Sequence, residues 1–145
     1  MNLEIAASGQ SRVEIYQWLF IQPDCPLDKT RLPCFEALFY EPFYQFMRQQ
    51  FLAHEMEKVH ELGADLVSLM HISPEHNKDF KRVTAPELVG LADSATGAWK
   101  KLVRPHDRFG AVSTEMLFGW FPVADYPQMK DWWEYVTQRY DWVVL

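Results

Sequence analysis

The clearest periodic pattern in the sequence is the helical one of residues 44–55, which read YQFMRQQFLAHE. At about 100° per residue, these positions form two neighbouring stripes along a helix. The first stripe is apolar and consists of Tyr44, Met47 and Phe51. The second is polar at its N-terminal end and apolar afterwards, in the order Gln45, Arg48, Gln49, Leu52, Met56 and Val59. We expect the later turns to be buried, while the first turns present the polar side chains either to a cleft or to solvent.

The boundaries of this helix are marked by a proline and a glycine. The pattern predicts a helix from about Pro42 to Leu62, with Gly63 as its C-terminal stop. The mostly apolar run Asp65–Ile72 follows and is ended by Ser73-Pro74, so we expect a buried strand there. A helix, a glycine and a buried strand in this order form the second half of an α/β unit.

The segment Arg12–Ile21, RVEIYQWLFI, is rich in β-branched and aromatic residues. Val13 and Ile15 alternate with Glu14 and Tyr16, and this period of two favours a strand. A short buried helix is the alternative, because a run of this length does not separate the two periods clearly.

The remaining segments complete a small α/β or α+β fold. We expect an irregular start over residues 1–10, a proline-containing loop over 22–33 and a polar loop over 74–85. Helical pieces should follow over 86–103, then a short edge strand over 108–112 and a short helix that begins at Ser113. The last helix should run from a cap at Asp125, with Pro127 in its first turn, to about Tyr140. The predicted architecture is a single domain over residues 1–145, in which helices flank a small mixed sheet.

Composition supports a folded protein with a sizeable core, since 48% of the 145 residues are hydrophobic and 15% are aromatic. The net charge of −6 argues against strong non-specific binding to nucleic acid or to anionic membranes. The charge is unevenly spread, however, because Lys78 to Arg108 contains seven basic and four acidic residues. This region, 78–108, predicts either a local basic surface that contacts nucleic acid or a solvated helix face.

The sequence lacks the features of exported and membrane proteins. Its start, MNLEIAASG, has neither a basic region nor a long apolar run, and no segment reaches the roughly 18 apolar residues of a membrane span. Cys25 and Cys34 form neither a CxxC motif nor a Cys/His ligand pattern. We therefore expect a cytoplasmic protein without a membrane partner and with two reduced thiols.

No complete catalytic motif appears in the chain. His54-Glu55 and His60 resemble HExxH, but the second histidine falls six positions after the first instead of four. The two rings are then about 120° out of alignment on a helix, so they do not share a zinc ion. Neither a GxSxG turn nor a glycine-rich phosphate loop is present. The pattern therefore predicts no metal site of its own.

The order of elements and residues resembles restriction-endonuclease-like proteins of the PD-(D/E)XK nuclease superfamily, in particular an uncharacterised bacterial branch with QxxRxxxLA before an apolar strand. The helix contributes Gln45, Arg48, Gln49, Leu52 and Ala53 to this resemblance, and the strand and following loop contribute residues 67–74 and Asn77. Trp99, Arg108-Phe109, Tyr135 and Arg139-Tyr140 fit the same pattern loosely.

The resemblance implies a trimmed restriction-endonuclease-like core. In that superfamily, an Asp on one core strand and an E-x-K on the next hold Mg²⁺, while the lysine polarises the nucleophile. By position, Glu14 is the carboxylate and Tyr16 stands where the lysine belongs, and no Asp precedes Glu14. Mg²⁺ is thus a cofactor only if this site is functional, and such a site needs a sheet with three antiparallel strands.

Three functions follow, in this order of preference. The first is a catalytically inactive or truncated nuclease relative that still binds nucleic acid through Gln45, Arg48, Gln49 and the 78–108 region. The second is an acidic protein–protein interaction module of the immunity or inhibitor type, which uses its aromatic C-terminal surface to bind a partner or a second copy. The third is an active metal-dependent nuclease with Glu14 as a catalytic residue. Convergence of Glu14, Gln45 and Arg48 on one open cleft would favour a nuclease-derived site, whereas Glu14 pointing to bulk solvent or a helical 13–21 segment would rule that site out.

Overall fold

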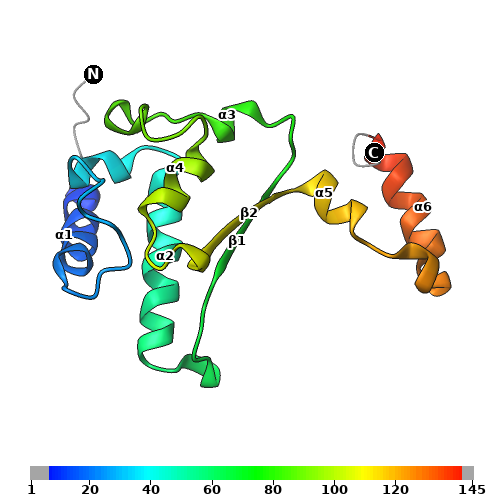
Figure 1. Cartoon of the computed structure of the whole chain (residues 1–145), viewed down its shortest axis with the longest axis horizontal. Coiled ribbons are helices and arrows are strands. Elements are labelled where there is room, and N and C mark those ends of the chain that lie inside the picture. Colours follow the sequence, from blue (N-terminus) through cyan, green and yellow to red (C-terminus); the bar gives the residue numbers. More distant parts are fainter. Residues whose placement is uncertain (1–6, 142–145) are drawn as a thin grey trace. The chain divides into compact units, whose positions relative to one another are not determined.

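The computed structural model describes the backbone of residues 7–141 and the side chains of residues 13–141. The chain forms two compact units (Figure 1). The first unit contains the residues up to 69 together with 80–110, and the second contains 70–79 together with the residues from 111 onward. The single domain expected over residues 1–145 stays a prediction. No helix in the described part of the chain is long and apolar enough to cross a membrane.

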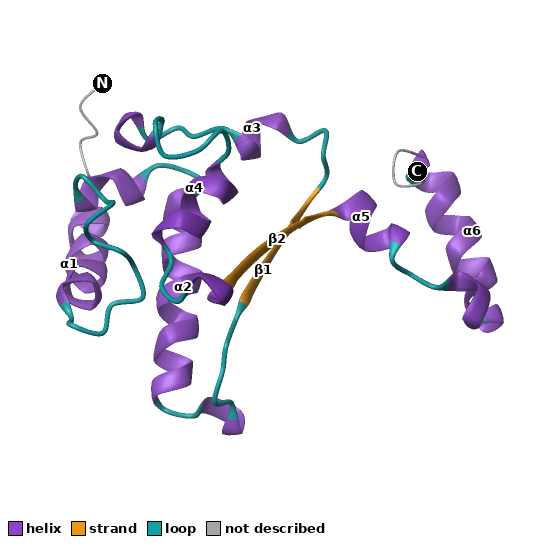
Figure 2. Ribbon diagram, viewed as in Figure 1, coloured by secondary structure: helices purple, strands orange, loops and turns teal. Residues whose placement is uncertain are grey.

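The first unit is mainly helical (Figure 2). Its α-helices are α1 (Ala7–Ile21), α2 (Phe43–Lys58) and α4 (Ala95–Leu102), and its 3-10 helices are η1 (Phe35–Phe39), η2 (Glu61–Gly63), η3 (Pro86–Leu88) and η4 (His106–Arg108). The short helix α3 (Lys78–Lys81) stands at the boundary between the two units along the chain. The helical pieces predicted over 86–103 are therefore confirmed as η3 and α4.

Strand β1 (Leu69–Ser73) and strand β2 (Phe109–Ser113) pair in parallel and form the sheet of the described residues. Helices α3 and α4 lie in the connection between the two strands, as a parallel pair requires a long crossover. The mixed α/β fold class is thus confirmed, and so are the two predicted strands, each with its start shifted along the chain. The expected burial of the first strand is wrong, because no residue of β1 is buried and Met70 is 61% exposed. The three antiparallel strands that a two-carboxylate metal site needs are not found among these residues.

The strand predicted over residues 12–21 is wrong, because this segment belongs to helix α1. The side chains that pack against the core follow helical spacing, and they are Val13, Tyr16, Leu19 and Phe20. Ile15, which the alternation placed on the buried face with Val13, is exposed instead. The irregular start expected over residues 1–10 is helical from Ala7, and residues 1–6 lie outside the described part of the chain.

Helix α2 is held by its packing against helix α4. Its buried apolar side chains include Phe43, Phe46, Met47 and Phe51. Trp99 of α4 is fully buried, and its ring centroid lies 5.8 Å from that of Phe46. Phe109 of β2 approaches the same ring, with 5.6 Å between centroids. This aromatic cluster is the centre of the core of the first unit and fixes the orientation of α2 about its axis.

The C-terminal part of α2 differs from the prediction in two respects. The helix ends at Lys58, four residues early, because the chain turns back through left-handed conformations at His60 (φ 51°), Leu62 (φ 53°) and Gly63 (φ 77°). The expected burial of the later turns is also wrong, since Leu52 is 62% exposed and Val59 is 66% exposed. The buried face of α2 lies on the side of Phe46 and Phe51, so the stripe through Leu52 and Val59 faces away from the core.

The second unit contains the helices α5 (Thr114–Gly119) and α6 (Lys130–Arg139), and the 3-10 helices η5 (Val123–Asp125) and η6 (Pro127–Met129). Ser113 begins α5 as expected, because its Oγ accepts a hydrogen bond of 3.0 Å from the Met116 N–H. The last helix starts later than predicted, at Lys130, and the predicted cap at Asp125 is wrong because Asp125 lies in η5. Among the described residues of this unit, Val112, Glu115 and Val136 are the buried ones.

The packing of Trp99 predicts a large loss of stability when its side chain is truncated. Trp99→Ala should lower the free energy of unfolding by about 3–5 kcal/mol, because it leaves a cavity in the aromatic cluster. Exposed Trp18 provides the control, since Trp18→Ala should change the same quantity by no more than about 0.5 kcal/mol. Urea denaturation followed by circular dichroism measures both. Equal effects of the two substitutions would contradict the assignment of Trp99 to the core.

Candidate functional site

The polar flank of α2 faces an open groove between α1 and α2, which we call the α1–α2 groove. It has a volume of about 440 Å³ and is lined by Tyr16, Leu19, Gln45, Arg48, Gln49, Phe51, Leu52 and Glu55. The structure therefore brings together Gln45, Arg48 and Gln49 on one open groove, where all three side chains are also exposed to solvent. The role of these three residues in binding stays a prediction.

Aromatic contacts build the floor of the α1–α2 groove. Tyr16 of α1 stacks on Phe51 of α2, with 6.4 Å between ring centroids, and meets Tyr44 edge to face at 6.0 Å. The guanidinium of Arg48 lies 5.6 Å from the centroid of the Tyr44 ring, in a cation–π arrangement. The side chain of Arg48 is thus supported by a ring that the core holds in place, while its N–H donors remain accessible at the groove.

Glu14 does not join the α1–α2 groove. It is exposed on α1, and two residues along a helix turn a side chain by about 200°, so Glu14 and Tyr16 lie on different sides of α1. Tyr16 lines the groove and Glu14 does not. The expected convergence of Glu14 with Gln45 and Arg48 is therefore not found, and its placement on a core strand is wrong. A catalytic role for Glu14 stays a prediction without that structural support.

The described residues do not fit the Mg²⁺ site of the PD-(D/E)XK superfamily. The carboxylate in the α1–α2 groove is that of Glu55, whose Oε1 already accepts a hydrogen bond of 3.0 Å from the Lys58 ammonium. Nowhere in the described range do three or more His, Cys, Asp or Glu side chains come together as metal ligands. No step that depends on a bound metal can therefore be built from these residues.

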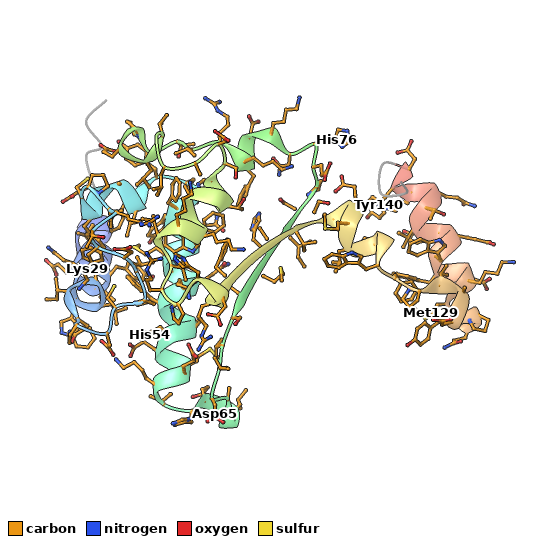
Figure 3. All side chains as sticks on the ribbon, in the orientation of Figure 1. Lys29, His54, Asp65, His76, Met129 and Tyr140 are labelled. Atoms are coloured by element: carbon orange, nitrogen blue, oxygen red, sulfur yellow. The ribbon has the colours of Figure 1, made fainter. Side chains whose placement is uncertain are left out.

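A second cavity, which we call the Gln50 pocket, lies at the later turns of α2. Its volume is about 350 Å³, and its lining residues are Asp24, Pro26, Gln50, His54, Glu57, Lys58, Arg104, Pro105 and Arg108. Gln50, His54 and Lys58 are spaced by four residues and therefore share one side of the helix (Figure 3 labels His54). The opposite wall is fixed to the end of α4, because the Arg104 N–H donates to the Pro26 carbonyl at 2.8 Å.

Ion pairs surround the Gln50 pocket. The Arg108 Nε–H donates to Glu57 Oε1 at 3.1 Å, and the Lys58 ammonium lies 3.1 Å from Asp24 Oδ2. The hydrogen bond from Lys58 lowers the pKa of Asp24 and keeps this exposed carboxyl ionised. His54 Nε2 is 3.5 Å from the same carboxylate and makes no hydrogen bond to the described residues. The pocket is therefore rich in charges that are already oriented.

Gln50 is the unusual member of this lining. It is only 1% exposed, and its Oε1 has no hydrogen-bond partner among the described residues. Sequence reasoning missed both Gln50 and the pocket. The available signal was its position, because Gln50 falls between Phe46 and Phe51 on the apolar side of α2, where a polar side chain is unexpected. A buried amide without a partner costs stability and calls for an explanation.

Several basic side chains of the region 78–108 make ion pairs or hydrogen bonds with other residues of the first unit. The Arg104 guanidinium pairs with Asp28, Arg108 pairs with Glu57, and the Lys101 ammonium donates to the Leu91 carbonyl at 2.7 Å. These contacts position the chain after α4. Contact of this region with nucleic acid stays a prediction.

The second unit carries an aromatic cavity, which we call the aromatic pocket. Its volume is about 380 Å³, and it is lined by Leu117, Phe118, Trp120, Phe121, Pro122 and Trp132. Phe118 and Trp132 stack with 6.2 Å between centroids, and Trp120 is 64% exposed. The aromatic C-terminal surface expected from the sequence is thus present, although Trp142 lies outside the described residues.

One family model matches this chain. The family is described as Restriction Endonuclease associating with ARP, and the match covers residues 7–141. No curated protein and no solved structure matches the chain.

The unpartnered amide of Gln50 predicts that an apolar residue of similar size stabilises the protein without ligand. Gln50→Leu should raise the free energy of unfolding by about 1–3 kcal/mol, because it removes a buried polar group that has no hydrogen bond. Exposed Gln17 on α1 is the control, and Gln17→Leu should have an effect within about 0.5 kcal/mol. Urea denaturation measures both values. A loss of stability in Gln50→Leu would show that the amide is satisfied in solution.

Proposed function

Because the chain belongs to the restriction endonuclease family described as Restriction Endonuclease associating with ARP, we propose that it binds nucleic acid in the α1–α2 groove without cleaving it. The observation that carries this proposal is the placement of Gln45, Arg48 and Gln49 together on one open groove beside Tyr16.

The chemistry of these four side chains suits nucleic acid. The Arg48 guanidinium is a planar donor fork that pairs with a phosphate through two hydrogen bonds. The Gln45 and Gln49 amides offer both donors and acceptors, which sugars, phosphates and base edges can satisfy. The half-buried Tyr16 ring lines the groove and adds an apolar contact for a base or sugar. With one arginine in the groove and a net charge of −6, binding is weak and depends on salt.

The proposed absence of cleavage rests on the carboxylates. Hydrolysis of a phosphodiester in this superfamily uses carboxylates that hold a metal ion near the scissile phosphate. In the α1–α2 groove, Glu55 is engaged by Lys58, and Glu14 lies elsewhere on α1. The active nuclease is therefore the less favoured alternative, since it needs Glu14 to acquire partners that the described residues do not bring to it.

Removing the Arg48 guanidinium should weaken DNA binding and make it less dependent on salt. Arg48→Ala should lower the slope of log K against log salt by about 1, because one phosphate contact is lost. Fluorescence anisotropy with a short duplex at several salt concentrations measures the slope. Arg139→Ala, in the second unit, is the matched control and should keep the wild-type slope. Equal slopes for wild type and Arg48→Ala would contradict the groove as the binding site.

Cleavage is tested with the same duplex and purified protein in the presence of Mg²⁺ or Mn²⁺. We expect intact DNA. Cleavage by the wild type that is lost in Glu14→Ala and kept in Arg139→Ala would establish the active-nuclease alternative instead.

A second candidate function is supported by the aromatic pocket. The family is described as associating with ARP, and the second unit exposes Trp120 beside an almost wholly apolar cavity. Aromatic side chains are enriched where proteins bind one another, and a contiguous apolar patch on a small unit marks such a surface. We propose that a protein partner packs on Trp120, which agrees with the interaction-module alternative. A second copy of the chain is the other occupant to test.

Trp120→Ala should therefore abolish a stoichiometric complex. The tagged full chain, expressed in its native host, should co-purify with one protein in a fixed ratio, and Trp120→Ala should lose it because the central aromatic contact is gone. Trp18→Ala is the control, since Trp18 is 58% exposed in the first unit and should leave the complex intact. Sedimentation of the pure protein distinguishes a homodimer. A monomer that co-purifies with nothing would contradict this function.

A further inference from the structure

The Gln50 pocket is not used by the proposed function, yet it has the features of a binding site. On one side of α2, Gln50 Oε1 is buried without a hydrogen bond to the described residues, and His54 Nε2 lies 3.5 Å from the Asp24 carboxylate. Both residues line a cavity of about 350 Å³, a size in the range of small-molecule sites. A buried polar group without a partner is costly, and a ligand that supplies the missing hydrogen bonds removes that cost.

The charges in the lining indicate the sign of the ligand. Three side chains are cationic, namely Lys58, Arg104 and Arg108, and two are anionic, namely Asp24 and Glu57. Each of these cations also pairs with a carboxylate, Arg104 with Asp28 and Lys58 with Glu55 as well as Asp24, so the N–H donors left over, and not the net charge, favour an anion. Arg108 has five N–H donors, and its contacts with Glu57 and Asp107 involve Nε and Nη1, so the planar fork has further donors to offer. A phosphate suits such a fork.

The amide of Gln50 indicates the rest of the ligand. A planar amide presents one acceptor and one donor group side by side, and it pairs with a ligand edge that has a neighbouring donor and acceptor. The adenine edge at N6 and N7 is such a partner for glutamine.

We propose that the Gln50 pocket binds a nucleoside monophosphate, with the adenine edge against Gln50 and the phosphate toward Arg108 and Lys58. Pro26 and Pro105 supply the apolar walls beside the base and ribose. The pocket lies on a different side of α2 from the α1–α2 groove, since its lining shares no residue with that of the groove. The proposal therefore stands independently of DNA binding.

Isothermal titration of the full-length protein with AMP tests this proposal. We expect one AMP to bind per chain, and Gln50→Leu to weaken its affinity by roughly tenfold or more through loss of the bidentate pair. Gln17→Leu, with the same chemical change on the exposed surface of α1, should bind AMP as the wild type does. Arg48→Ala should also keep its AMP affinity; if it does not, AMP occupies the α1–α2 groove and the proposal is wrong.

A change in the ligand gives a test that needs no variant. Purine riboside 5′-monophosphate lacks the exocyclic amine of adenine, so it should bind the wild type roughly tenfold or more weakly than AMP. Inorganic phosphate should bind more weakly still. The proposal fails if wild-type protein does not bind AMP, if Gln50→Leu binds it unchanged, or if inorganic phosphate matches AMP in affinity.

Discussion

The packing of one face of α2 against Trp99 is the interaction on which the rest of the first unit depends. Phe43, Phe46 and Trp99 are fully or almost fully buried, and together they fix the rotation of α2 about its own axis. Once that rotation is set, helical geometry decides where every other side chain of α2 lies. Gln45, Arg48 and Gln49 then face α1 across an open groove, whereas Gln50 and His54 face the loop at Asp24 and the end of α4. Both candidate sites are consequences of one buried stripe.

This dependence explains what the sequence could predict. The stripe of Tyr44, Met47 and Phe51 gave a correct helix, and the polar flank beside it was correctly identified as distinct. The prediction failed for Arg12–Ile21, where alternation of Val13 and Ile15 over a few residues fits both a strand and a helix. Tertiary contacts distinguish them, such as that of Tyr16 with Phe51, and a contact across thirty-five positions is not visible in local periodicity. Because Glu14 was assigned through that strand, its assignment lost its basis together with the strand.

The Gln50 pocket was missed for a related reason. Its walls come from α2, from the loop at Asp24 and from the segment after α4, and three segments so distant along the chain share no motif. The basic region 78–108 was noticed for its charge, but charge counting did not reveal that Arg104 and Arg108 are held by Asp28 and Glu57. Family membership shows what the chain is related to, but it does not establish a mechanism. Activity depends on the chemical groups that a fold brings together at a site. Here the groove brings together amides and a guanidinium, with its carboxylate paired to a lysine.

The central claim is that nucleic acid occupies the groove between α1 and α2. Chemical-shift mapping of the labelled protein with a short DNA duplex tests it most directly, because it reports the contact surface residue by residue. The account predicts saturable shifts at Tyr16, Gln45, Arg48 and Gln49, with the signals around Trp120 unchanged. Shifts confined to the second unit, or no shifts at DNA concentrations where anisotropy shows binding by the wild type, would contradict it.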